Sequence, residues 1–187
     1  PVVFGGNDLP GVMLSGAVRS YSNRYGVAPG RRAVVITNND DAYRTVFAMI
    51  EAGIHVAAIV DMRPAAAGPL VAEAMRMGLS VHSSHAVLAA EGTRHLGYAK
   101  IARYNPKTGD VTGDPFYIDC DLIAMSAGFT PLVNLHSQAR GKLEWDEEFC
   151  CFKPSTYHEA AQSAGAGNGA FDLATAMAEG AQAGAEA

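Results

Sequence analysis

Apolar runs alternate with amphipathic segments along the first half of the chain, and this alternation predicts an α/β fold. AVVI at 33–36 predicts a buried strand, and residues 41–53 place their apolar side chains on one helical face. IHVAAIV at 54–60 is almost continuously apolar, which is typical of a parallel strand covered on both faces. A helix near 68–77 and a short strand at 79–81 are expected next. The right-handed crossover rule then gives a three-strand parallel sheet with helices on its faces.

A change of pattern after this unit predicts an antiparallel meander. Residues 84–91 and 95–104 are extended segments of mixed apolarity, and the turn signal NPKTGD at 105–110 separates them from a third short strand at 115–118. DLIAM at 121–125 has the apolar character of another buried strand. We therefore expect the meander to cover one side of the sheet before the chain returns to it.

The two ends of the chain give weaker patterns. Helical spacing of apolar residues predicts a helix over 11–25. Residues 138–155 are expected to be irregular, with the charged run EWDEE at 144–148 in a solvated loop. SAGAGNG at 163–169 is expected to lead into a last helix over about 170–186. The chain has no initiating Met, and we expect it to be a piece of something longer.

Composition and charge exclude several classes of partner. Of the 187 residues, 49% are hydrophobic and 18% charged, which is enough apolar material for a core. The net charge of −5 argues against nucleic acid or anionic membrane as a partner. No apolar run approaches the ~18–20 residues of a membrane span, and no export signal is visible. Cys120, Cys150 and Cys151 form no Cys-x-x-Cys pair, so we expect a reducing, cytoplasmic environment.

The turn after the first strand lies where a dinucleotide-binding fold places a glycine-rich loop, yet residues 37–42 read TNNDDA. Asn38 and Asn39 tolerate left-handed backbone and offer amide groups, so they could partly replace glycine at an anion site. Asp40 or Asp41 is expected to cap the helix, which would compete with a phosphate for the same N–H groups. Both a capped structural turn and a phosphate site remain open.

Asp61 ends the second predicted strand, at the position where an acidic residue binds adenosine ribose hydroxyls in NAD-binding folds. Arg63, two residues later, could meet a 2′-phosphate. The alternative is a strand-end turn whose charges are solvated. Together, Asn38, Asn39, Asp61 and Arg63 form one candidate cofactor crevice.

Histidines and nucleophiles give no catalytic or metal site. His82 and His85 have no third ligand spaced nearby, and their i, i+3 spacing on an extended segment predicts rings on opposite faces. His55 is expected to lie in the core of its strand. No Ser–His–Asp or Cys–His arrangement can be defended from spacing, so no catalytic residue is assigned.

The phrase DCDLIAMSAGFTP at 119–131 resembles the D-x-x-x-x-A-x-G-x-x-P junction of the two-dinucleotide-binding flavoproteins, thioredoxin reductase and its relatives. More narrowly, the chain is similar to the alpha-subunit family of the heterotetrameric sarcosine oxidases. The similarity covers the chain and is carried by FGGNDLPGVMLSGAVRSYSNRYGVAPGRR, VVITNNDDAYRTV, AAIVDMRP and SAGFTPLVNLHSQARGKLEWDEE.

That resemblance implies a domain organisation. Residues 1–30 would be the tail of an outer dinucleotide-binding domain with its linker. Residues 31–126 would be an inserted, Rossmann-like, NAD-binding-type α/β domain with a parallel sheet and an antiparallel meander. Residues 127–187 would return to the outer FAD/NAD(P)-binding domain and supply its final helix. The rest of the outer domain and an aminomethyltransferase-like domain would lie elsewhere in a longer chain.

The resemblance also implies the cofactors. NAD would lie mostly in the outer domain, where this chain contributes Gly167, Asn168, Gly169, Leu173 and Thr175. Flavoproteins of the wider family place a Gly-Asp there for the flavin, but this chain has no Asp in its turn. We therefore expect FAD or FMN only in a partner subunit or at the subunit interface. The missing Cys-x-x-Cys excludes disulfide reduction.

The implied activity is oxidative demethylation of sarcosine to glycine, with peroxide formed and a one-carbon unit passed to tetrahydrofolate. The implied partners are the beta, gamma and delta subunits, and the isolated chain is expected to be inactive. Alternatives left open are a subunit of an opine or other amine oxidase, an NAD(P)H-dependent reductase domain using the 37–63 crevice, and a subunit-docking scaffold that binds no nucleotide.

Overall fold

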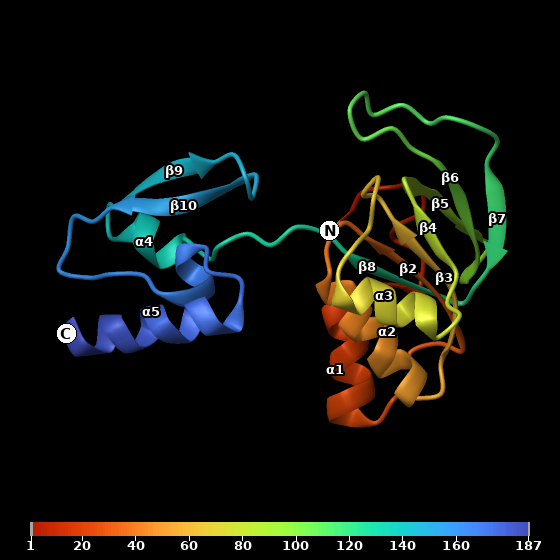
Figure 1. Ribbon diagram of the computed structural model, residues 1–187, viewed down its shortest axis with the longest axis horizontal. Helices are drawn as coiled ribbons and strands as arrows, with labels where there is room; N and C mark the ends of the chain where they lie inside the picture. The colour runs from red at the N-terminus through yellow and green to blue at the C-terminus, as the bar shows by residue number, and fades with distance from the viewer. Residues whose placement is uncertain (1, 187) are drawn as a thin grey trace. The chain divides into compact units, whose positions relative to one another are not determined.

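The computed structural model describes residues 2–186, which fall into two compact units divided after Ala127. Each unit has its own strands and helices (Figure 1). Among the described residues, no helix combines the length and apolar character needed to cross a membrane.

The first unit is built on a five-stranded, all-parallel sheet. Its order across the sheet is β1 (Val12–Leu14), β8 (Leu122–Ser126), β2 (Arg32–Thr37), β3 (His55–Asp61) and β4 (Val81–Ser83). β2 and β8 are buried almost throughout, because both faces of the sheet are covered.

Three helices cover one face of this sheet and the meander covers the other (Figure 1). The helices are α1 (Ser15–Tyr25), α2 (Asp41–Glu51) and α3 (Pro69–Arg76), and the meander strands are β5 (His85–Gly92), β6 (Leu96–Arg103) and β7 (Phe116–Asp119). Alternate side chains of β2 serve the two layers: Val35 packs with the helices, and Val34 packs with the meander.

The predicted α/β class is confirmed, and so are the buried strands and the meander. The parallel sheet was predicted with three strands, but it has five because β8 and β1 join it. β1 is only three residues long and runs directly into α1, so its VML reads as part of the helical pattern. Strand β4 begins two residues later than predicted.

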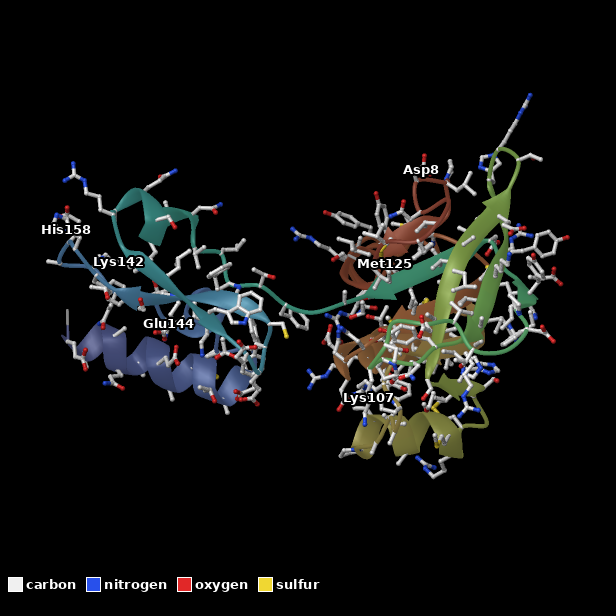
Figure 2. The ribbon with its side chains drawn as sticks, turned by 90° about the horizontal axis from the view of Figure 1, so that it is seen from above. Asp8, Lys107, Met125, Lys142, Glu144 and His158 are labelled. Carbon is white, nitrogen blue, oxygen red and sulfur yellow. The ribbon has the colours of Figure 1, made fainter. Side chains whose placement is uncertain are left out.

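The second unit contains α4 (Asn134–Gln138), the hairpin of β9 (Lys142–Asp146) and β10 (Cys151–Thr156), a 3₁₀ turn (Gly165–Asn168) and α5 (Leu173–Glu186). The expectation that 138–155 is irregular was wrong. Lys142 and Glu144 lie on β9 (Figure 2), and the Trp145 ring packs edge-to-face on Phe152 of β10 at 5.1 Å. Only the end of the charged run, Glu147–Glu148, lies in the turn.

Gly30 lies where the chain enters β2 against the start of β8. The backbone N–H groups of Arg31 and Arg32 donate to the Asp121 carboxylate at 2.8–3.0 Å, which pins two segments 90 residues apart. A Cβ at Gly30 would lie 2.7 Å from the Leu122 Cβ, so this close approach requires glycine.

We predict that Gly30→Ala lowers the free energy of unfolding by about 1–3 kcal/mol, because the added methyl group overpacks the β2–β8 junction. Gly16→Ala, on helix α1, is the matched control, because a Cβ at Gly16 would meet no atom within 4 Å. It should raise stability by about 0.5–1 kcal/mol. Urea unfolding measures both, and equal effects of the two substitutions would contradict the packing argument.

Candidate functional site

The carboxyl ends of β2, β3 and β8 meet at one edge of the parallel sheet. Thr37 pairs in register with Asp61 on one side and with Ser126 on the other. Ligands of open α/β sheets bind at such an edge, so this is the crevice that the sequence predicts as a cofactor site.

Asn39 fills the turn between β2 and α2 with its own side chain. Its Oδ1 accepts hydrogen bonds from the Asp41 N–H and the Ser126 hydroxyl, both at 3.1 Å. Its Nδ2 donates to the Ala127 carbonyl at 2.7 Å and to Asn38 Oδ1 at 3.1 Å. The amide therefore ties the turn to the end of β8, and it occupies an N–H at the start of α2 that an anion would need.

Two details of this turn differ from what its sequence suggests. Asn38 and Asn39 do not replace glycine by adopting left-handed backbone: the described non-glycine residues with positive φ are Ser84, Arg140 and Cys150. Asp40 holds the N-cap position of α2 but makes no side-chain capping bond.

The aspartates instead form ion pairs. Asp40 accepts from Arg63 Nη1 at 2.8 Å, and Asp41 accepts from both terminal nitrogens of Arg19 on α1 at 3.1 and 3.2 Å. The bond to the first N–H of α2 comes from Asn39 instead, whose Oδ1 accepts from the Asp41 N–H two residues on in an Asx turn.

Asp61 is fully buried, with 0% exposure. Its Oδ1 accepts from the backbone N–H and the Nε of Arg63, both at 3.0 Å. Its Oδ2 accepts from the Tyr43 hydroxyl at 2.9 Å and from Arg63 Nη2 at 2.8 Å. A carboxylate has about four acceptor positions, and all four are filled here by the protein itself.

The electrostatics of this network keep it closed near neutral pH. Burial raises the pKa of the Tyr43 hydroxyl above its ordinary value, and its hydrogen bond to Asp61 raises it further. The hydrogen bonds that Arg63 donates to Asp61 raise the pKa of its guanidinium. Tyr43 therefore stays protonated as a donor, and Arg63 stays charged as the counter-ion of Asp61 and Asp40.

A glycine-rich turn lies in the other unit, at 165–169. A Cβ at Gly167 would meet no atom within 4 Å, whereas Gly169 has φ 93° and lies against the Lys153 side chain. Gly167 also lines a cavity of about 350 Å³ within this unit, together with Leu132, His136, Tyr157 and Ala164. Unlike the crevice of the first unit, this turn presents open space beside its backbone.

The remaining residues predicted for this turn are accessible. Asn168 is half-buried and donates from Nδ2 to Glu179 at 3.3 Å. Leu173 is 76% exposed, and Thr175 is exposed with its N–H bonded to Asp172. Sequence reasoning missed Glu179, Tyr43 and Arg19, which make polar contacts in the two regions. Each bonds to a partner 11 to 22 positions away in the sequence, and no local motif marks such a pair.

The histidine expectations also need correction. The rings of His82 and His85 lie together, with centroids 5.5 Å apart, and both contact Phe116. Ser84 between them has φ 57°, which breaks the alternation that would place them on opposite faces. His55 is exposed at the start of β3 and does not lie in the core. No group of three or more metal-ligating side chains occurs among residues 2–186.

We predict that Asp61→Ala lowers the free energy of unfolding by about 3 kcal/mol, because it leaves Tyr43 and Arg63 without their shared partner. Asp8→Ala, at an exposed aspartate near the N-terminus (Figure 2), should change it by no more than about 0.5 kcal/mol. Chemical denaturation of both variants checks this. A loss at Asp61 as small as that at Asp8 would show that the network is not formed.

Solved structures share the fold. Thioredoxin reductase of T. acidophilum superposes with a TM-score of 0.66 at 19% identity, over 88% of this chain and 53% of that chain. L-proline dehydrogenase of P. horikoshii gives 0.58 at 20% identity, over 89% and 27%. Mycobacterium tuberculosis FprA in complex with NADPH gives 0.57 at 14% identity, over 96% and 58%. No family model matches the chain.

Curated relatives are more similar in sequence. Sarcosine oxidase subunit alpha of Corynebacterium sp. (strain P-1) is 38% identical over 187 residues, which is 100% of this chain and 19% of that protein. The same subunit of Rhizobium meliloti (strain 1021) is 38% identical over 97% of this chain and 17% of its own length. The chain thus spans about a fifth of the length of these relatives. By sequence, the chain is similar to one segment of the sarcosine oxidase alpha subunits, and its fold is shared with the solved oxidoreductases above.

Proposed function

We propose that this chain is the dinucleotide-binding portion of the alpha subunit of a sarcosine oxidase complex, and that the dinucleotide is NAD. The NAD site lies at the turn of residues 165–169 and the start of α5, in the outer domain that residues 127–187 help to form. Residues 31–126 form an inserted domain that serves as a scaffold, and residues 1–30, whose β1 and α1 pack on this domain, link it to the outer domain.

The single observation that carries this assignment is the saturated carboxylate of Asp61. A ribose hydroxyl needs a free acceptor at that position, but the four bonds from Arg63 and Tyr43 leave none. A diphosphate would also meet Asp40 and Asp41 at the start of α2, where the Asn39 amide already occupies the Asp41 N–H. These contacts argue against an NAD(P)H-dependent reductase that uses the 37–63 crevice.

The turn at 165–169 has the opposite character. Gly167 leaves room for a ligand beside its backbone, and Asn168 and Gly169 add no charge there. Leu173 and Thr175 are exposed at the start of α5, so their side chains are available for contact. The fold neighbour FprA binds NADPH, which supports dinucleotide binding by this architecture.

The whole complex would oxidise sarcosine to glycine, release peroxide and pass a one-carbon unit to tetrahydrofolate. The beta, gamma and delta subunits would be its partners, and FAD or FMN would sit in a partner subunit or at the subunit interface. The curated relatives are themselves subunits of sarcosine oxidase, which supports this assignment.

A subunit-docking scaffold without any nucleotide is the second candidate. It is favoured by the exposed apolar side chains of the second unit, among them Leu132 at 84% and Leu135 at 80%. The two candidates differ in one measurable property, because only the first requires saturable NAD binding.

We predict that Gly167→Trp weakens NAD⁺ binding to the full-length protein by about 100-fold or more, because the indole would fill the space that the ligand needs. Asn38→Trp is the matched control at the mouth of the first crevice, where the side chain is exposed. It should change the dissociation constant by no more than about twofold. Isothermal calorimetry of both variants measures the difference.

If Asn38→Trp weakened NAD⁺ binding strongly and Gly167→Trp did not, NAD would bind in the 37–63 crevice and the proposal would be overturned. Absence of any saturable NAD⁺ binding to the wild-type full-length protein would favour the docking scaffold.

We predict that the purified 187-residue chain releases no peroxide from sarcosine, because residues 2–186 give no candidate acid–base pair and no candidate flavin site. A peroxidase-coupled assay checks this, with an intact sarcosine oxidase complex as the positive control. Peroxide formation by the isolated chain would show that it holds a catalytic centre of its own.

A further inference from the structure

Glu179 on α5 is bonded to both ends of the glycine-rich turn. Its Oε2 accepts a hydrogen bond from the Gly165 N–H at 2.9 Å and from Asn168 Nδ2 at 3.3 Å. The carboxylate is partly buried, and Ala176, one helical turn before it, lies 3.5 Å from the Cβ position of Gly165. The turn is therefore held against α5 by one carboxylate and one small side chain.

This arrangement fixes which end of the Asn168 amide is free. A carboxylate accepts hydrogen bonds but donates none, so it must bind the NH₂ end of the amide. The opposite end, Oδ1, has no hydrogen-bond partner among the residues that the structure describes. Gly167, beside it, has open space at its Cβ position. The turn thus offers one oriented, uncharged acceptor next to open space.

We propose that Glu179 is a positioning residue, which orients Asn168 so that Oδ1 accepts a hydrogen bond from a sugar hydroxyl of the bound dinucleotide. This inference rests on the proposed function, because it concerns the same site. The ligand group must be a donor, and hydroxyls are the neutral donors that a dinucleotide sugar presents.

The division of charge between the two residues supports this role. The negative charge lies on Glu179 of α5, and the side chain at position 168 is a neutral amide. A carboxylate at position 168 would repel a diphosphate and would also lie about 3.3 Å from the carboxylate of Glu179. The pair therefore supplies an acceptor for a hydroxyl without adding charge beside the phosphates.

The test is calorimetric titration of the full-length protein with NAD⁺. Glu179→Ala should weaken binding about fivefold to tenfold, and Asn168→Ala by a similar factor. The double variant should bind no more weakly than Asn168→Ala alone, because Glu179 acts through Asn168. Glu186→Ala is the matched control: it removes a carboxylate from the same helix, where Glu186 is bonded only to Gln182 among the described residues. It should leave binding unchanged.

A pH profile separates positioning from a general structural role. Asn168→Asp places two carboxyl groups together, so the pair retains a proton and its apparent pKa is raised. Binding of NAD⁺ to this variant should therefore weaken as the pH rises from 5 to 8. Adding Glu179→Gln should remove most of that pH dependence, because only one ionisable group remains.

Additive losses in the double variant, or a flat pH profile for Asn168→Asp, would overturn the positioning role while leaving NAD binding intact. Failure of the wild-type protein to bind NAD⁺ would overturn both this inference and the proposed function.

Discussion

The buried carboxylate of Asp61 is the constraint on which the first unit depends. A charge with no solvent exposure must be compensated by the protein, and here Arg63 and Tyr43 do so from two different elements. Tyr43 ties α2 to the end of β3. Arg63, in the loop after β3, bonds both Asp61 and Asp40 and so ties that loop to the start of α2. The same bonds that stabilise the end of the sheet fill the place where its ligand would bind.

The turns at 37–42 and 165–169 both use an asparagine amide, but the two amides are bonded differently. At the first turn, both the oxygen and the nitrogen of the Asn39 amide are hydrogen-bonded to other groups of the protein. At the second, Glu179 takes one end of the Asn168 amide and leaves the other available. A shared α/β fold therefore does not imply a working site at its usual crevice, and the assignment depends on which polar groups remain unpaired.

The fold could be read from the sequence wherever a single periodicity extends over enough residues. β2 and β3 are continuous apolar runs and were predicted to within one or two residues. β1 could not be found because three residues carry too little pattern, and the β9–β10 hairpin was hidden by charged residues on its exposed face. The hydrogen bonds of Asn39 and Asp61 also could not be predicted from the neighbouring sequence. Their partners come from β8 and α2, and only the folded chain brings those groups within hydrogen-bond distance.

We propose that the dinucleotide binds at residues 165–169 while the 37–63 crevice stays closed by its own side chains. Hydrogen–deuterium exchange of the full-length protein with and without NAD⁺ tests it directly. We expect added protection of backbone amides over 163–175 and no change over 37–63. Protection of the 37–63 segment without change at 163–175 would contradict it.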